Sequence, residues 1–195
     1  MTTFEIEIIR DTARPAARAL AERARNPLPG LNIAARALAN GLKSHFRAKN
    51  QTPNRLGGAR SNYWLGVAQA VNAPQQTGPN SVAVAISHPS FNQKVYGGTI
   101  RAKAAKSLTI PIHPDAHGRR ASVLERALGL KLFRVKDALA ARGADGKLTF
   151  YYALKQSVTQ KPDPSALPPE SEMQRIVSEN FNRWFMGPQS GAQPA

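Results

Sequence analysis

The 195 residues are enough for one substantial hydrophobic core, and a hydrophobic content of 42% is typical of a folded protein. Twenty-seven lysines and arginines against 12 acidic residues give a formal net charge of +15, so we expect acidic partners, either nucleic acid or acidic protein surfaces. The absence of cysteine excludes disulfides, thiolate metal sites and cysteine nucleophiles.

The N-terminal residues give no sign of a secretory or membrane-inserted protein. Glu5 and Glu7 stand where a signal peptide would carry cations, and no stretch reaches about 18 consecutive apolar residues. We therefore expect a soluble protein that has no membrane partner.

The first third of the chain predicts a strand and two helices. Phe4, Ile6 and Ile8 alternate with other residues as in a short strand with one buried face. Asp11 or Thr12 can cap a helix that runs to about Arg25, and residues 26–30, NPLPG, end it. A second helix is expected from about Leu31 to Lys49, because apolar residues recur at helical spacing. These are Leu31, Ala34, Ala35, Leu38, Leu42, His45 and Phe46.

Residues 50–112 predict loops, a short helix and strands. Residues 50–62 resemble a loop, and the alternation over 82–86 predicts a strand inside the sheet. Residues 63–71 fit a short helix better than a strand, although their length leaves both open. Residues 95–112, VYGGTIRAKAAKSLTIPI, predict a β-hairpin-like module that places a basic arm between two strand-like pieces. Pro111 lacks an N–H for the sheet and indicates an edge strand or a strand end.

The following residues, HPDAHGRRASVLER, predict a polar and basic insertion or arm. A short strand is expected near residues 130–135, a turn at 143–146, and one long strand over 148–158. Pro168 and Pro169 followed by Glu170 predict the start of a C-terminal helix. Its apolar stripe would face a core or a partner and comprises Met173, Ile176, Val177, Phe181, Trp184 and Phe185.

Together these elements predict an α+β fold. A mostly antiparallel sheet would be flanked by N-terminal helices and a C-terminal amphipathic helix, with extended basic loops or arms. We expect a single domain over residues 1–186 with an inserted basic arm region around 88–128, and a flexible tail over 187–195.

Catalytic and cofactor motifs are absent from the sequence. There is no Ser/His/Asp order, no G-x-S-x-G elbow, no Walker motif and no paired carboxylates, so we expect neither an enzyme nor a cofactor. A hydrolase with an unrecognised site is the weakest alternative. His113 and His117 have a helical metal-binding spacing, but Pro114 and Gly118 disfavour a helix there, so a turn with exposed histidines is preferred to a metal site.

Nucleic-acid binding is a stronger alternative. Tyr63, Trp64 and Tyr96 lie among loop cations, a mixture found at phosphate and base contacts. Those cations are Arg55, Arg60, Lys94, Arg101, Lys103, Lys106, Arg119, Arg120 and Arg126. No helix-turn-helix, zinc finger or RNP signature occurs, so binding would be independent of sequence.

Three stretches of the chain carry a family resemblance. They are HFRAKNQTPNRLGG, YGGTIRAKAAKSLTIPIHPDAHGRRAS and YYALKQSVTQKPDPSALP before the C-terminal helix. They resemble the tailed-phage virion morphogenesis and tail-completion proteins, which join head to tail. The most specific element is a strand, then GGTI with a basic residue, a short spacer and an apolar L-x-I-P segment. The similarity covers roughly residues 40 to 186.

The resemblance implies a structural virion protein that forms a homo-oligomeric ring, with a hexamer as one option, around the DNA channel at the neck or upper tail. Implied partners are further copies of the chain, adjacent neck, connector or tail-tube proteins, and genomic DNA; the chain would assemble in the host cytoplasm. Connector, terminator and minor tail protein all remain open. Candidate subunit-interface or DNA-facing residues are Tyr96, Gly97, Gly98, Arg101, Lys103, Lys106, Arg119 and Arg120. The alternative is a sequence-nonspecific DNA-binding protein that acts alone.

Overall fold

The computed structural model describes residues 13–53, 56–57 and 60–187, and these residues fall into two compact units. Unit 1 contains residues 13–41, 72–85 and 169–187; unit 2 contains residues 42–71 and 86–168, apart from the undescribed positions. The division falls inside one helix, between Gly41 and Leu42. Six α-helices accompany antiparallel sheets in the described part of the chain, so the predicted α+β class is confirmed.

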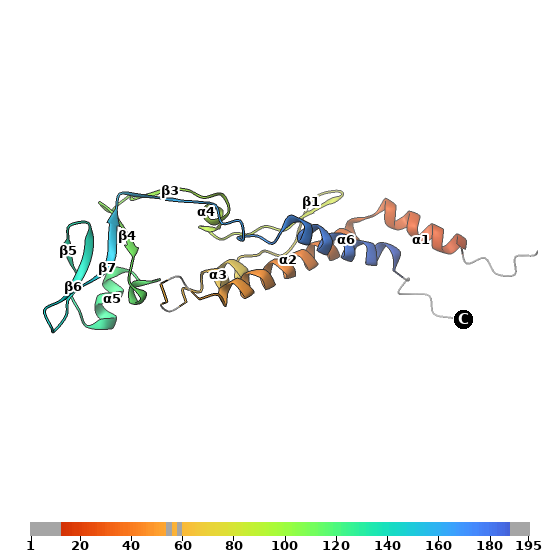
Figure 1. Cartoon of the computed structure of the whole chain (residues 1–195). Coiled ribbons are helices and arrows are strands. Elements are labelled where there is room, and N and C mark those ends of the chain that lie inside the picture. Colours follow the sequence, from red (N-terminus) through yellow and green to blue (C-terminus); the bar gives the residue numbers. More distant parts are fainter. Residues whose placement is uncertain (1–12, 54–55, 58–59, 188–195) are drawn as a thin grey trace, which may run out of the picture. The chain divides into compact units, whose positions relative to one another are not determined.

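Unit 1 consists mainly of helices (Figure 1). It contains α1 (Ala13–Arg25), the first part of α2 (Leu28–Asn50) and α6 (Glu170–Met186), and a hairpin of β1 (Gln75–Gly78) and β2 (Ser81–Ala83). Its buried hydrophobic residues are the small side chains Ala34, Ala35 and Ala39 of α2, and neither α1 nor α6 has a fully buried residue. The predicted C-terminal helix is confirmed, and its apolar stripe is half-buried.

Two glycines let α6 approach α2 closely. A Cβ on Gly30 would lie 2.1 Å from Trp184 Cε3, and a Cβ on Gly41 would lie 2.9 Å from Ile176 Cδ1. Because eleven residues are close to three helical turns, both glycines lie on the same face of α2. At Gly30 the close contact requires the absence of a side chain, because the indole ring is rigid, whereas at Gly41 only the flexible end of Ile176 is in the way.

Unit 2 contains a four-stranded antiparallel sheet in the order β4-β7-β6-β5. The strands are β4 (Leu108–Pro111), β5 (Phe133–Val135), β6 (Ala138–Arg142) and β7 (Leu148–Lys155). The short helices η1 (Pro114–Ala116) and α5 (Ala121–Leu128) contribute Ala116 and Leu124 to a core with Ala141, Tyr151 and Tyr152. β4 lies at the edge of this sheet, as Pro111 predicts.

A β-bulge explains why two adjacent tyrosines are both buried. Leu139 pairs with Tyr152, but the next residue of β6, Ala140, pairs with Phe150, so Tyr151 is an extra residue on β7. An extra residue interrupts the alternation of side chains between the two faces of a strand. Tyr151 and Tyr152 can therefore both join the core.

A second group of buried rings in unit 2 surrounds the end of α2. Phe46 is fully buried, stacks on Trp64 at a centroid distance of 6.0 Å and meets Phe91 edge-on at 5.4 Å. Trp64 belongs to α3 (Tyr63–Gln69) and Phe91 to α4 (Phe91–Tyr96). The prediction of a short helix after the loop is confirmed.

The predicted hairpin over residues 95–112 is wrong. Val95 and Tyr96 end α4, and the two strands of the tract do not pair with each other. β3 (Gly98–Arg101) pairs with β8 (Ser157–Gln160) in a two-stranded ribbon, whereas β4 pairs with β7 (Figure 1). Each strand of the tract thus pairs with a strand that lies about forty residues or more later in the chain.

Three further expectations need correction. The strand predicted inside the sheet over 82–86 is instead β2, which pairs only with β1, followed by an isolated bridge from Ile86 to Val71. The single strand predicted over 148–158 is broken at Gln156 into β7 and β8. The residues after Ile112, predicted as an insertion or arm, form η1 and α5 and supply core residues, because Leu124 and Ala116 are apolar and face the sheet.

Helix α2 begins at Leu28 rather than Leu31, because Pro29 occupies a first-turn position that needs no N–H donor. The predicted N-terminal strand, the cap at Asp11 or Thr12, and residues 188–195 of the predicted tail lie outside the described residues. None of the helices in the described ranges combines the length and the apolar character needed to cross a bilayer.

Candidate functional site

Part of the predicted basic arm, residues 98–101, forms β3 of the two-stranded ribbon of β3 and β8 in unit 2. Arg101 pairs with Ser157 and Leu108 pairs with Lys155, so residues 102–107 stand opposite the single residue Gln156. The amide of Ala102 still donates to the carbonyl of Gln156 at 3.1 Å. Residues 102–107 connect the two ladders as a loop, which is called the basic loop below.

Cations on the basic loop and its neighbouring strands have no acidic residue close in sequence. Arg101, Lys103 and Lys106 are exposed, and the segments 96–112 and 146–162 contain no Asp or Glu. Lys155, the last residue of β7, comes shortly before the opposing strand β8. All four residues of β3 are exposed as well. The cations of the ribbon and the basic loop are therefore not neutralised by acidic residues near them in the sequence.

Two of the predicted site residues, Gly97 and Gly98, shape the base of the ribbon. Both have positive φ, at 70° and 126°. A Cβ on Gly97 would lie 2.6 Å from the backbone oxygen of Gln160, whereas Gly98 has more room. Tyr96, the last residue of α4, is 76% exposed. The glycine pair therefore permits a close approach of two segments of the same chain.

The remaining predicted site residues lie elsewhere. Arg119 and Arg120 connect η1 to α5 and are exposed, and the carbonyl of Arg119 accepts a hydrogen bond of 3.0 Å from Tyr152 Oη. Burial raises the pKa of this tyrosine and the charge of Arg119 opposes that shift. These two arginines are on a separate segment from the basic loop.

The aromatic residues of α6 pack within unit 1. Phe181, Trp184 and Phe185 contact one another at centroid distances of 5.6 to 6.3 Å. The guanidinium of Arg23 lies 5.7 Å from the centre of the Trp184 ring and donates to the carbonyls of Phe185 and Gly187. All three side chains are half-buried in unit 1.

A hollow of about 620 Å³ in unit 2 gathers residues from separate parts of the sequence. Its lining combines cations, aromatic rings and small polar side chains from α2, α3, α4 and the segment after η1. Arg60, Lys94, Tyr63 and Trp64, part of the basic and aromatic mixture in the sequence, meet here. The described lining residues are His45, Lys49, Asn50, Thr52, Pro53, Arg60, Ser61, Asn62, Tyr63, Trp64, Lys94, His117, Gly118 and Ser165.

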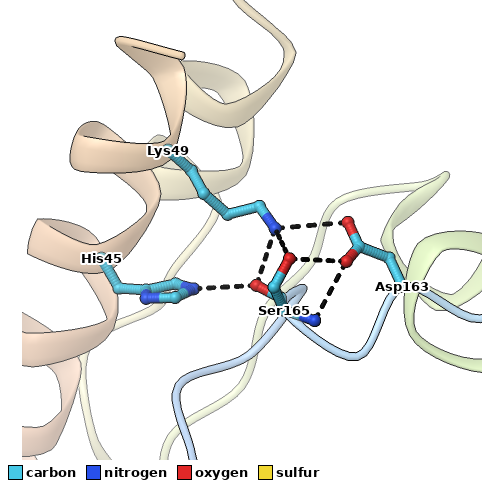
Figure 2. Close-up of polar contacts among 4 residues, drawn as sticks. All are labelled: His45, Lys49, Asp163 and Ser165. Carbon is cyan, nitrogen blue, oxygen red and sulfur yellow. Dashed lines mark hydrogen bonds and ion pairs between the residues drawn. The ribbon is translucent and has the colours of Figure 1, made fainter.

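Polar contacts join α2 to residues 163–165 (Figure 2). Three residues of this group, His45, Lys49 and Ser165, line the hollow. Lys49 Nζ donates to Ser165 Oγ at 2.6 Å and to Asp163 Oδ2 at 3.2 Å. Ser165 Oγ in turn donates to Asp163 Oδ1 at 2.7 Å, and the ring of His45 contacts the carbonyl of Ser165 at 3.2 Å. This polar clasp attaches the loop that follows β8 to the end of α2.

The clasp holds Asp163 in its charged form. Burial raises the pKa of this carboxyl, but hydrogen bonds from Ser165 and Lys49 and the charge of Lys49 together hold the pKa below its ordinary value of 3.8. Lys49 Nζ also lies 4.4 Å from the centre of the Trp64 ring. Lys49 therefore contacts both the carboxylate of Asp163 and an aromatic ring of α3.

The two histidines considered for a metal site have different surroundings. His113 Nδ1 accepts from the amide of Asp115 at 3.3 Å, and its ring lies 4.8 Å from that of Tyr151. His117 Nδ1 is buried and has no hydrogen-bond partner within the described residues. In the described part of the chain, no three His, Asp or Glu side chains gather as metal ligands. A turn, η1, separates the two histidines.

Sequence reasoning did not identify the polar clasp, because Lys49 and Asp163 are separated by 114 positions and neither belongs to a motif. The mixture of basic and aromatic residues in the loops was the sequence feature that could have indicated the hollow.

Comparisons of the chain with protein-family models, with curated proteins and with solved structures find no match.

Proposed function

We propose that this chain is a structural subunit of a tailed-phage or phage-like particle, acting in an oligomeric ring at the neck or upper tail. The observation that carries the proposal is the ribbon of β3 and β8, with six residues of the basic loop opposite Gln156. The tract that carries the family resemblance forms β3, the basic loop and β4. An exposed two-stranded ribbon has free backbone groups that a neighbouring subunit can pair with or clasp.

An apolar sheet surface gives independent support for assembly. On the sheet of unit 2, Leu139 and Ala141 face the core, so Ala138 and Ala140 lie on the opposite face. The strand register places Phe133 and Phe150 on either side of Ala140 on that outer face. Phe133 is 40% exposed and Phe150 is 43% exposed. Exposed aromatic rows of this kind are typical of surfaces that bind protein.

Positive charge suits either acidic neighbouring subunits or DNA in the channel. The ribbon can meet an acidic protein surface without a catalytic step, and its cations can equally contact phosphates. A sequence-nonspecific DNA-binding protein that acts alone therefore remains the competing function.

Sedimentation velocity combined with a salt titration of DNA binding separates the two functions. We expect the purified chain to sediment as an oligomer, and the triple variant Arg101→Gln, Lys103→Gln, Lys106→Gln to fold but to dissociate or to lose head–tail joining in a particle assembly assay. The matched control removes three exposed helical cations, through Arg18→Gln, Arg36→Gln and Arg47→Gln, and should assemble normally. A monomer that binds DNA with a steep salt dependence would overturn the structural function.

A further inference from the structure

The hollow in unit 2 has an excess of positive charge. None of its described lining residues is acidic. Lys49 is neutralised by Asp163, but Arg60 and Lys94 have no carboxylate partner within the described residues. Arg60 donates from one guanidinium nitrogen to Gln51 Oε1 at 2.7 Å, which leaves further N–H groups for a ligand. Two cations at one cavity without counter-charge favour an anion.

Aromatic rings complete the lining. Tyr63 and Trp64 lie side by side at a centroid distance of 5.1 Å, and Lys94 Nζ lies 5.7 Å from the centre of the Tyr63 ring. Tyrosine is neutral at neutral pH, and burial raises the pKa of Tyr63 above its ordinary value of 10.0, so its ring does not repel an anion. The volume of about 620 Å³ lies within the range of small-molecule sites.

We propose that this hollow binds a phosphate group, with Arg60 and Lys94 supplying the charge. Guanidinium and ammonium groups are the usual donors to phosphate oxygens. The phosphate can come from a nucleotide, whose base would contact Tyr63 and Trp64, or from free inorganic phosphate. The proposal does not depend on the ribbon or on ring assembly.

The chain's two tryptophans allow a direct test. In a Trp184→Phe background, Trp64 is the only tryptophan, and its fluorescence reports on the hollow. We would titrate this variant with adenosine monophosphate, inorganic phosphate and adenosine, and repeat the titrations on the wild-type chain by calorimetry. Binding of the monophosphate or of phosphate, with adenosine much weaker than the monophosphate, supports the proposal. Tighter binding of the monophosphate than of phosphate identifies a nucleotide as the source.

Charge variants show whether the named residues hold the phosphate. Arg60→Gln with Lys94→Gln should weaken binding by roughly tenfold or more, because two charge-assisted contacts are lost. The control, Lys131→Gln with Lys147→Gln, removes two exposed cations of unit 2 outside the hollow and should bind like the wild type. Lys94→Gln alone is used if the double variant does not fold. Adenosine binding as tightly as the monophosphate, equal loss in both double variants, or no heat and no fluorescence change with any probe would overturn the proposal.

Discussion

Lys49 and Asp163 form the central ion pair of the polar clasp, with Nζ 3.2 Å from Oδ2 (Figure 2). The side chain of Lys49 is 18% exposed and that of Asp163 is 31% exposed, so water screens this pair less than it screens the other ion pairs of unit 2. The pair joins α2 to the loop after β8, which are far apart in sequence. It therefore stabilises long-range structure rather than one local turn.

Asp163→Asn should lower the free energy of unfolding of unit 2 by about 1 kcal/mol at pH 7, because the amide oxygen still accepts from Ser165 but the charge that holds Lys49 is lost. The pKa of Asp163 is held below 3.8 in the folded chain, so this stabilisation is present above pH 3.8 and is lost as the pH falls through the lower folded-state value. Urea unfolding across pH 5 to about pH 2 measures this difference.

Asp145→Asn is the matched control for that prediction. Asp145 pairs with Lys147 at 3.7 Å, but both side chains are more than half exposed, and an asparagine can still accept from the amide of Lys147. Its effect should stay below about 0.5 kcal/mol at every pH. Equal effects of the two substitutions would show that burial of the Lys49–Asp163 pair contributes nothing.

The α2–α6 contact of unit 1 makes a second prediction. Gly30→Ala places a methyl group 2.1 Å from the indole of Trp184, so the rigid ring or the helix must move, and the unfolding free energy of unit 1 should fall by about 1–3 kcal/mol. In Gly41→Ala the methyl group instead meets Cδ1 of Ile176 at 2.9 Å, and this flexible end can rotate away. Thermal unfolding followed by circular dichroism should show a clear loss for Gly30→Ala and little change for Gly41→Ala. The opposite order would contradict the close packing on Trp184.

The helices could be predicted from the sequence because their signals are local. The apolar stripe of α6 repeats every three or four residues, at Met173, Val177, Phe181 and Trp184. Pro169 precedes the first turn of this helix. These signals hold whatever the helix packs against. The helical spacing of α5 was missed because its eight residues are short and follow a strongly polar segment.

Strand partners could not be predicted in the same way. The alternation over Leu108–Pro111 shows that the segment is a strand with two different faces, but it carries no information about which strand lies beside it. β4 pairs with β7, and β3 with β8, although the sequence between β3 and β4 looked like the loop of a hairpin. The clasp depends on these pairings, since β8 leads into residues 163–165. The strand partners and the polar clasp, which sequence analysis did not predict, are therefore the features that depend on long-range pairing.

The third prediction concerns the glycine at the base of the ribbon. Gly97 has φ 70° and ψ −157°, a combination that is essentially restricted to glycine, and a Cβ there would lie 2.6 Å from the oxygen of Gln160. Gly97→Ala should destabilise unit 2 by about 2–4 kcal/mol, because backbone strain and a backbone clash add. Hydrogen exchange should show the loss in the β3 and β8 amides before it appears in the four-stranded sheet.

Gly146→Ala separates the clash from the strain in that experiment. Gly146 has φ 80° in the turn between β6 and β7, and a Cβ there would meet no atom within 4 Å. Its replacement should cost only the strain of positive φ, about 1 kcal/mol, and should leave the ribbon amides protected. If Gly97→Ala costs no more than Gly146→Ala, the approach of residue 97 to Gln160 does not hold the ribbon in place. A larger loss of amide protection that is confined to β3 and β8 would show that this contact holds the basic loop to the rest of unit 2.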